Sequence, residues 1–549
     1  MRVADTIVEI LKTEGVPFVA GFPGDDLLPL WDALYECGDI PLIVTRHEQA
    51  SVFMADGYAR SSGEPGVAIV TNGPGRTNAL TAILNAFTDS VPLVVLFGHT
   101  SLKFLGKGAL QEAPYLDLFA PVAKWVFGIP SADRVPEAFR RAFTLARSGR
   151  PGPVILEVSE DILTDKIERT PYRRTRRVRF GPDASDVDSA LALMRESRRP
   201  LVYAGRGALS AGATEELKTL VETYSIPFMT SLMAKGTVPE DHPLCLGLGG
   251  YPRALYSTAP AQRYAEEADL VIALGCSFPQ LATSNWLPKP AETHVIQVDV
   301  DPAELQKNYL ADVTVLSDAK LFLQALLHKA PEVLGRWRRE ERLSVLEGIR
   351  VAKARWLDFW KPRLTSDEVP MNPFRVSWEL GRLLDRHNTI LLHDAGTTRA
   401  YISHHYETLF PKGFIGFGNT SAMGWSTPAA MGVKLGHPGK TVVNVIGDGS
   451  FGMTGMEIET AARNDIRTVT VIFNNQCLNA TRDRQLRRFG EREIGILLGG
   501  DYAGLARALG AYGERVERPD DLKTTLDRAL SHPGPAVLEV IVKPLEPRP

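Results

Sequence analysis

The chain has 549 residues, 44% of them hydrophobic and 23% charged, which is the composition of a globular protein too long to fold around one core. Its formal net charge of -3 lacks the basic excess that nucleic-acid or membrane binding usually requires, so we expect neither partner. The four cysteines stand far apart, which indicates neither a zinc motif nor a disulfide framework and favours a reducing cytoplasm.

The N-terminal stretch MRVADTIVEILKTEGV places polar residues among its apolar ones throughout, unlike a secretory signal. The sequence also has no apolar run of about 18 residues, the length that a membrane-spanning helix needs. We therefore expect an unprocessed cytoplasmic protein.

Short apolar runs alternate with helical patterns in the first third of the chain. The runs are PLIV, GVAIV, VPLVVLFG and PGPVILEV. Strands buried on both faces of a parallel sheet have this composition, and the helices between them supply the crossovers. The pattern predicts a doubly wound domain over residues 1–168. The basic stretch that follows, DKIERTPYRRTRRVRFGPDAS, lacks apolar periodicity, and we interpret it as a solvated linker rather than a nucleic-acid patch.

The same pattern occurs twice more. The runs LVYAG, SIPFMTSL, ADLVIALGC and THVIQVDVDP predict a central domain over residues 186–335. Gly205 and Gly207 form a GxG turn there, a weak dinucleotide signal that a close-packed strand-to-helix turn explains better. After a second polar link, TILLH, TVVNVIG, TVTVIFN and PAVLEVIV predict a third domain over residues 370–549. We expect an α/β protein of three consecutive doubly wound parallel-sheet domains, and leave open whether the outer two are related.

Oxygen-bearing side chains follow two strands of the third domain. Asp448 comes after the strand at 442–446, and Asn475 comes after the strand at 468–473. Parallel strands joined by a right-handed crossover end at the same edge of a sheet, so these side chains should meet. One carboxylate, one amide and a backbone carbonyl such as that of Cys477 suit Mg²⁺, which completes its shell with water and phosphate oxygens.

The turn around this carboxylate is suited to a diphosphate. Gly447 and Gly449 let the backbone approach a ligand closely, and Ser450 follows. The turn is expected to open the helix containing TGMEIETAARN, whose N-terminal N–H groups can bind phosphate. Alternatively, the GDG residues form an ordinary Asp-Gly turn and the NN residues an ordinary loop at the end of a strand, with no ligand. The occurrence of both motifs at this spacing makes that alternative less favoured than a cofactor site.

The residues GDGSF, followed by NN after the intervening helix, resemble the signature of the thiamine-diphosphate superfamily of decarboxylases, carboligases and oxidases. Over nearly the whole chain the resemblance is to acetohydroxyacid (acetolactate) synthases. It is carried by GFPGDDLLPLWDAL, TRHEQASVFMADGYAR, TNGPGRTN, AFTDSVPLVVLFG and GNTSAMGWSTPAAMG. The resemblance implies pyrimidine, central and diphosphate domains, with thiamine diphosphate and Mg²⁺ as cofactors. It also implies a homodimer or tetramer with shared active sites, since the family's glutamate and metal site come from different subunits.

Three residues match catalytic positions of that family. Glu48 in TRHEQA matches the glutamate that contacts N1′ of the pyrimidine and assists proton removal from the thiazolium C2. Met423 matches the large apolar residue that holds the cofactor bent, with backbone groups around it and Ser421 on the pyrimidine edge. A surface glutamate and a core methionine are the alternatives. Gln111 in GALQEA matches a glutamine that hydrogen-bonds a carbonyl or hydroxyl of the substrate.

The resemblance assigns further cofactor contacts to two turns. They are Pro74 and Asn78 in GPGRTN on the pyrimidine side, and Asp394, Gly396, Thr397 and Thr398 in HDAGTT on the diphosphate side.

The expected substrate pocket departs from the family at three positions. Pro23 stands where some lyases and decarboxylases carry a histidine, so we expect no proton transfer there. Ala480 and Arg484 stand where a methionine and a tryptophan shape the synthases' acceptor pocket. Arg484 would favour an anionic substrate, and a solvated helix face is the alternative. The segment CSFPQLATSNW replaces the Arg- and Asp-rich flavin segment of the synthases, which argues against FAD.

The sequence therefore predicts a carboligase or decarboxylase of 2-keto acids or related carbonyls that depends on thiamine diphosphate and Mg²⁺ and resembles acetolactate synthase. A simple 2-keto acid decarboxylase or 2-hydroxyacyl lyase is the alternative of the same class. A flavin-linked pyruvate oxidase is opposed by the replaced flavin segment, and a noncatalytic cofactor-binding subunit is opposed by Glu48.

Overall fold

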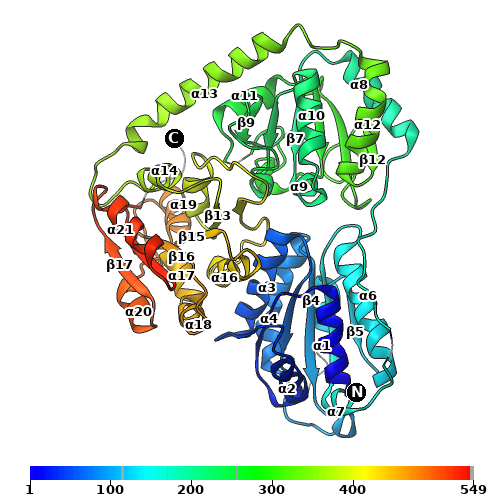
Figure 1. The fold of residues 1–549 in the computed structure, drawn as a ribbon. Coiled ribbons are helices and arrows are strands. Elements are labelled where there is room, and N and C mark those ends of the chain that lie inside the picture. The colour runs from blue at the N-terminus through cyan, green and yellow to red at the C-terminus, as the bar shows by residue number, and fades with distance from the viewer. Residues whose placement is uncertain (113–115, 170, 255, 545–549) are drawn as a thin grey trace.

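The structure is a computed structural model that describes residues 1–112, 116–169, 171–254 and 256–544. Three six-stranded sheets follow one another along the chain, each flanked by helices, as Figure 1 shows. Every pair of neighbouring strands within these sheets runs parallel. The arrangement confirms the predicted α/β class with three doubly wound sheets.

The first sheet has the strand order β2-β1-β3-β4-β6-β5. Its strands in chain order are β1 (Val19–Phe22), β2 (Leu42–Val44), β3 (Gly66–Val70), β4 (Leu93–His99), β5 (Trp125–Gly128) and β6 (Pro153–Ser159). The helices of this part are α1 (Val3–Glu14), α2 (Leu28–Cys37), α3 (Glu48–Ser62), α4 (Pro74–Thr88), α5 (Leu116–Phe119), α6 (Val135–Arg147) and α7 (Glu160–Thr164). Strands β3 and β4 are buried at every residue. Their continuous apolar sequences predicted this burial, because a sheet covered on both faces leaves no strand residue exposed.

The central sheet has the order β12-β11-β10-β7-β8-β9, the arrangement of doubly wound dinucleotide-binding folds. Its strands are β7 (Pro200–Ala204), β8 (Phe228–Thr230), β9 (Cys245–Leu248), β10 (Leu270–Leu274), β11 (His294–Asp299) and β12 (Val313–Leu316). Its helices are α8 (Ala184–Glu196), α9 (Arg206–Ala211), α10 (Thr214–Tyr224), α11 (Ala259–Glu267) and α12 (Ala319–Leu334). The second polar link of the sequence is a 23-residue helix, α13 (Arg342–Leu364), that leads from the central to the third sheet (Figure 1).

The third sheet has the order β14-β13-β15-β16-β18-β17. Its strands are β13 (Thr389–His393), β14 (Phe414–Ile415), β15 (Thr441–Gly447), β16 (Val469–Asn474), β17 (Tyr512–Val516) and β18 (Ala536–Ile541). Its helices are α14 (Pro373–Leu383), α15 (Thr398–Ser403), α16 (Ser426–Gly436), α17 (Asp448–Thr454), α18 (Glu457–Arg463), α19 (Asn479–Phe489), α20 (Tyr502–Ala508) and α21 (Asp521–Ser531). Counted within its own sheet, the strand order is the same as in the first sheet, so the outer two units share a topology.

The helix expected after the Gly-Asp-Gly-Ser turn is interrupted. It begins at Asp448, but α17 ends at Thr454 and α18 starts only at Glu457. Gly455 lies at the break, where an added Cβ would come within 2.8 Å of the carbonyl oxygen of Phe451. The single helix predicted from the sequence is therefore two short ones.

Helices α3 and α16 join the first and third sheets through backbone contact. An added Cβ on Gly57 would lie 2.2 Å from the carbonyl oxygen of Ala429, and one on Gly432 would lie 1.9 Å from that of Met54. A buried ion pair reinforces the contact, because Arg60 Nε lies 2.5 Å from Asp56 Oδ1, which also accepts the indole N–H of Trp425 at 2.7 Å.

Across the described residues, no helix has both the length and the apolar character to cross a bilayer.

Candidate active site

The two oxygen-bearing loops of the third sheet meet as predicted from the strand order. Strands β15 and β16 are neighbours, with Gly447 paired with Phe473, so Asp448 and the 474–477 loop emerge side by side. Asp448 Oδ1 accepts the Gly449 N–H at 2.9 Å, while the buried Oδ2 has no hydrogen-bond partner within the described part of the chain. Burial raises the pKa of Asp448 to about 6. A cation there would pair with the free oxygen and favour the charged carboxylate.

The two adjacent asparagines have different surroundings. Asn474 is buried and donates to Glu539 Oε1 at 2.7 Å, so it braces the sheet. Asn475 is half-buried, and its Oδ1 accepts the Cys477 N–H at 3.2 Å. The carbonyl of Cys477 accepts the Asn479 N–H at 2.9 Å and retains a second lone pair. Described residues form no cluster of three or more His, Cys, Asp or Glu around a metal position, so any cation here depends on one carboxylate with amide and carbonyl oxygens.

Further predicted residues of the diphosphate side gather around this loop. An added Cβ on Gly449 would lie 3.6 Å from Met423 Cε, and one on Gly447 would lie 3.3 Å from Thr398 Oγ1. Ser450 is buried in the same helix turn, and Gly396 has a φ of +82° with open space beside it. Met423 and Thr398 are thus placed on either side of the Gly-Asp-Gly turn.

Both carboxylate oxygens of Asp394 accept hydrogen bonds from donors of its own chain. Its Oδ1 accepts the N–H groups of Ala395 at 2.7 Å and Gly424 at 3.1 Å, and its Oδ2 accepts the N–H and hydroxyl of Ser426. The carboxylate is therefore occupied by the turn that carries Met423, and it holds that turn in position. No local sequence signal distinguishes this bracing from direct ligand contact.

Ser421 has two side-chain partners in the structure. Its φ of +52° lies in the left-handed region, its Oγ donates to the Gly418 carbonyl at 3.3 Å, and it accepts Arg399 Nη1 at 3.0 Å. Sequence reasoning missed Arg399, which is buried beside this loop. It likewise missed Asn479, which donates to Thr397 Oγ1 at 3.4 Å and to the Tyr401 hydroxyl at 3.1 Å.

The residues of the pyrimidine side gather at the carboxyl edge of the first sheet. Glu48 is the first residue of α3, is 9% exposed, and accepts Asn78 Nδ2 at 3.0 Å on its Oε2. Pro74 begins α4 directly after Gly73, where an added Cβ would lie 2.6 Å from Gln111 Cβ. Pro23 is exposed, next to Gly24 that packs against Thr71 of the same edge.

The two sides of the site lie at opposite ends of α4. Asn78, near the start of α4, holds Glu48, whereas Thr88 at its end bonds the Thr420 hydroxyl at 2.6 Å, next to Ser421. The ten positions from 78 to 88 span about 15 Å at the rise of an α-helix. Within one chain, Glu48 therefore lies at the opposite end of α4 from Thr420 and the neighbouring Ser421.

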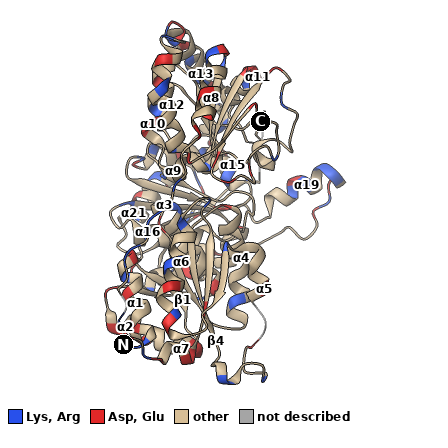
Figure 2. Ribbon diagram, turned by 90° about the vertical axis from the view of Figure 1, so that its right-hand side faces the viewer, with Lys and Arg blue, Asp and Glu red and all other residues tan. Residues whose placement is uncertain are grey.

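Helix α19 carries the predicted acceptor-pocket positions. Arg484 is exposed and Ala480 is half-buried, while Asp483 on the other face is buried. Figure 2 shows α19 standing out from the body of the molecule with several basic residues along it. In the single chain, the arginine thus lies on the solvated face, the alternative that the sequence left open.

The central domain has a cavity at the carboxyl ends of its strands. It encloses about 190 Å³ and is lined by residues that include Gly205, Arg206, Cys276 and Asp299. The GxG turn is close-packed, since an added Cβ on Gly205 would lie 2.2 Å from the Gly275 carbonyl oxygen. Burial raises the pKa of Asp299 to about 6.

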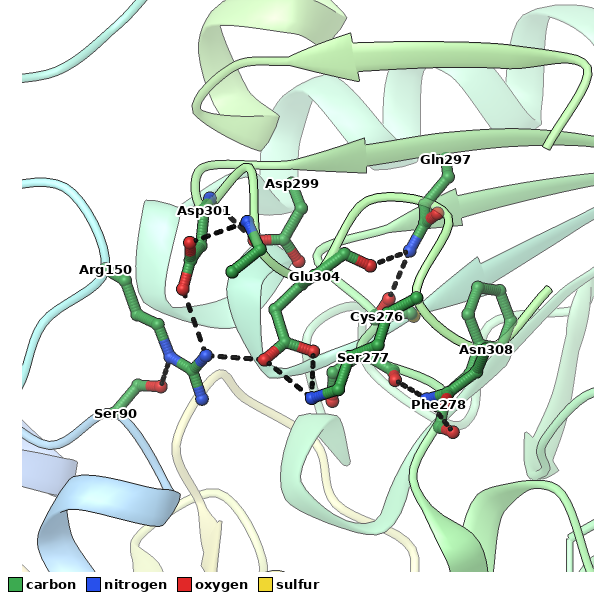
Figure 3. Close-up of polar contacts among 12 residues, drawn as sticks. Ser90, Arg150, Cys276, Ser277, Phe278, Gln297, Asp299, Asp301, Glu304 and Asn308 are labelled. Atoms are coloured by element: carbon green, nitrogen blue, oxygen red, sulfur yellow. Dashed lines mark hydrogen bonds and ion pairs between the residues drawn. The ribbon is translucent and has the colours of Figure 1, made fainter. Parts of the chain in front are cut away.

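Polar contacts fix the walls of this cavity, as Figure 3 shows. Arg150 of the first domain donates to Ser90 Oγ at 2.8 Å, to Asp301 at 3.1 Å and to Glu304 at 2.6 Å. Gln297 donates to the Cys276 carbonyl at 3.3 Å, and Asn308 donates to the Ser277 and Phe278 carbonyls. The cavity therefore has a wall of charged and amide side chains on one side and the close-packed GxG turn on the other.

Comparison with known proteins identifies the family. Residues 1–119 match the family described as thiamine pyrophosphate enzyme, N-terminal TPP binding domain, residues 187–326 match the central domain, and residues 394–540 match the C-terminal TPP binding domain. A probable acetolactate synthase large subunit of Methanocaldococcus jannaschii is 36% identical, covering 100% of this chain and 93% of its own length. The acetolactate synthase isozyme 3 large subunit of Escherichia coli is 32% identical, covering 96% and 92%. An acetolactate synthase of Arthrospira platensis is 33% identical, covering 98% and 94%.

These matches span the three sheets and both halves of the site. The resemblance inferred from the GDG and NN motifs is confirmed, and so is the dependence on thiamine pyrophosphate, the same compound as thiamine diphosphate. The chain belongs to the thiamine pyrophosphate enzymes, among the relatives of the acetolactate synthase large subunits.

Proposed function

We propose that this enzyme is a Mg²⁺-dependent carboligase of the acetolactate synthase type that acts on a 2-keto acid as a homodimer or larger homo-oligomer. The separation of Glu48 from the Met423 loop along α4 is the observation that carries the assembly, because one chain alone leaves the cofactor site in two halves. The relatives named acetolactate synthase support the reaction. Four free cysteines, three of them buried, are compatible with a reducing cytoplasm.

Exposed apolar side chains flank both halves and support a partner chain. Near Gln111 they are Phe104, 47% exposed, and Leu110, 85% exposed. Near Asp448 they are Met453, 61% exposed, and Leu497, 72% exposed. Large apolar side chains gathered around an incomplete site indicate a protein interface. A second copy, placing its Glu48 edge against this Asp448 edge, would cover both groups.

On the diphosphate side, the free Oδ2 of Asp448 and the oxygen of Asn475 would hold the Mg²⁺, with the Cys477 carbonyl as the third protein ligand. Gly447, Gly449 and Ser450 would bind the diphosphate. Asp394 would position the turn, and Met423 would support the bent cofactor.

On the pyrimidine side, Glu48 would share a proton with N1′ of a cofactor bound to the partner chain. Asn78 donates to Oε2 of the Glu48 carboxylate, so Oε1 would be the oxygen that contacts N1′. Thiamine diphosphate, when bound, supplies the electron sink that 2-keto acid cleavage requires. Gln111, whose φ of +63° presents its side chain from an exposed turn, would hydrogen-bond the substrate.

A simple decarboxylase or 2-hydroxyacyl lyase is the second candidate, favoured by Ala480 and Arg484 at the positions where the synthases carry a methionine and a tryptophan. On this interpretation, α19 places Arg484 and the small side chain of Ala480 at positions where an acceptor pocket would need large apolar side chains. The Arg484 guanidinium could instead pair with the carboxylate of the donor. We further propose that catalysis uses no FAD, since the segment CSFPQLATSNW stands where the synthases carry an Arg- and Asp-rich flavin segment.

Product analysis with pyruvate tests the proposal. The enzyme, with thiamine diphosphate and Mg²⁺, is expected to form acetolactate in excess over acetaldehyde, and removal of the metal by a chelator should abolish both. Acetaldehyde as the main product would select the second candidate. Turnover that survives complete metal removal would exclude the cation, and flavin absorbance in the purified protein would exclude the flavin-free assignment.

A further inference from the structure

A loop over residues 101–112 follows β4 in the first domain and carries the predicted substrate residue Gln111. At the start of the loop, Asp161 Oδ2 accepts the Ser101 hydroxyl at 3.0 Å and the Leu102 N–H at 2.8 Å. At its end, the Glu112 N–H donates to the carbonyl of residue 109 at 3.0 Å, which closes a four-residue turn. Gln111 occupies the third position of that turn.

The turn holds Gln111 in an unfavourable backbone conformation. Its φ is +63°, in the left-handed region, where glycine or asparagine is the usual residue at the third position of a turn. Gln111 is also exposed, so burial of its side chain offsets little of this cost. The conformation therefore depends on contacts made by other residues of the loop.

The carboxylate of Glu112 supplies such contacts, because it accepts three backbone N–H groups of the same loop. Its Oε1 accepts the Gly106 N–H, and its Oε2 accepts those of Ala109 at 2.9 Å and Gly108 at 3.1 Å. The two glycines have φ values of +76° and +74°, which glycine adopts without steric cost. These donors, the Gly106 N–H above all, lower the pKa of Glu112, so the carboxylate is charged at neutral pH and its hydrogen bonds are of the stronger, charge-assisted kind.

The same turn packs against the start of α4. An added Cβ on Gly73 would lie 2.6 Å from Gln111 Cβ, and one on Gly75 would lie 3.3 Å from Glu48 Oε1. The segment 73–75 therefore has Gln111 beside one end and Glu48 beside the other. A shift of the turn would change the position of Gln111 relative to Glu48.

We propose that Glu112 is a positioning residue, whose carboxylate holds the 109–112 turn closed and thereby keeps Gln111 in place to bind the substrate. The inference rests on the proposed function, in which Gln111 hydrogen-bonds the 2-keto acid. Both oxygens of Glu112 are occupied by backbone N–H groups, so Glu112 acts through Gln111 and not by its own contact with the substrate.

The sign of the change in KM separates this role from a purely electrostatic one. A 2-keto acid is an anion, which a nearby carboxylate repels. If Glu112 acted only through its charge, its removal would lower KM. If it positions Gln111, its removal raises KM.

Steady-state kinetics with pyruvate test the role in the full-length enzyme with thiamine diphosphate and Mg²⁺. Glu112→Ala is expected to raise KM about tenfold and to leave kcat and the affinity for thiamine diphosphate within about twofold, because only binding of the substrate is weakened. Glu112→Gln, which keeps one accepting oxygen, should give a smaller rise. Glu36→Ala, at an exposed position of α2, is the matched control and should behave as the wild type. An unchanged or lower KM in Glu112→Ala would overturn the proposal.

A double-mutant cycle connects the effect to Gln111. Gln111→Ala should raise KM at least as much as Glu112→Ala, and the double variant should be no worse than Gln111→Ala alone, because no side chain is left to position. Multiplied effects would overturn the positioning role and leave Gln111 as a substrate contact. A wild-type KM in Gln111→Ala would instead contradict the role of Gln111 in the proposed function, and the inference with it.

Hydrogen exchange gives a readout that does not depend on activity. The amides of Gly106, Gly108 and Ala109 donate to Glu112, so their exchange should become at least about tenfold faster in Glu112→Ala. Exchange in the buried strand β4 should stay as in the wild type. Unchanged exchange at the three loop amides would show that the carboxylate does not hold the loop, and would overturn the inference whatever the kinetics.

Discussion

Single side chains in this enzyme are placed by partners that lie far away in the sequence. Glu48 begins a helix and is held by Asn78, while Asp394 gives both of its oxygens to the turn that carries Met423. The sequence motifs identify both carboxylates as candidate site residues. Only the contacts show that Glu48 has one oxygen bound by Asn78, whereas Asp394 has both oxygens occupied. The first is suited to proton transfer and the second to positioning.

Glu48→Gln is expected to lower turnover by at least about a hundredfold, because an amide cannot share a proton with N1′. Cofactor affinity should change little, since the amide preserves the size of the side chain and a hydrogen bond to Asn78. Steady-state kinetics and a thiamine diphosphate titration measure the two effects. Turnover near the wild-type rate would contradict the assigned role.

His393 makes stability depend on pH. Burial lowers its pKa to about 3, whereas an unfolded histidine titrates near about 6.5. Below that pH, the unfolded chain binds a proton that the folded chain does not, so this residue lowers stability as the pH falls. The loss reaches at most about 2 kcal/mol at pH 5.

His393→Leu removes that loss. We compare the unfolding free energy of the variant with that of the wild type at each pH. Between pH 7 and pH 5, this difference should shift by about 2 kcal/mol in favour of the variant. Urea unfolding at both values measures the shift, with His387→Leu at an exposed position as the control. A difference that stays constant with pH would argue against a neutral buried imidazole.

At the scale of elements, the carboxyl edges of parallel sheets bring the motifs together, and α4 keeps the two halves apart. The register of β15 and β16 places Asp448 beside the 474–477 loop, as the crossover rule predicted. The break between α17 and α18 was not predicted, although it falls at Gly455 within the run TGMEIETAARN, and glycine is a poor helix former.

The backbone contact between α3 and α16 leads to a stability prediction. Gly57→Ala should destabilise the protein by about 1–3 kcal/mol, although alanine favours helices, because its Cβ would meet the Ala429 carbonyl. Gly439→Ala, with nothing within 4 Å, should stay within about 0.5 kcal/mol of the wild type. Thermal unfolding followed by circular dichroism measures both, and equal midpoints for the two variants would rule out the tight contact.

At the scale of the whole molecule, we propose that the predicted site is complete only in an assembly. Two sheets of one topology flank the α3 and α16 contact, so each chain presents one pyrimidine edge and one diphosphate edge. In the proposed assembly, the pyrimidine edge of each chain meets the diphosphate edge of the other.

Complementation tests this arrangement. Glu48→Gln and Asp448→Ala should each be inactive alone, because each lacks one half of every site. After subunits exchange, mixed dimers contain one intact site, so activity should return to about a quarter of the wild-type level in a statistical mixture. Mixed samples that stay inactive, despite exchange shown by native mass spectrometry, would place the whole site within one chain.

The sequence by itself determined the fold class, the cofactor and the candidate residues, because buried parallel strands and a diphosphate turn are encoded in short local patterns. The tertiary structure decided which groups meet. The occupied carboxylate of Asp394, the bracing role of Asn474 and the walls of the cavities beside the central sheet all depend on contacts between distant segments. Such contacts follow from packing, which local propensity does not specify.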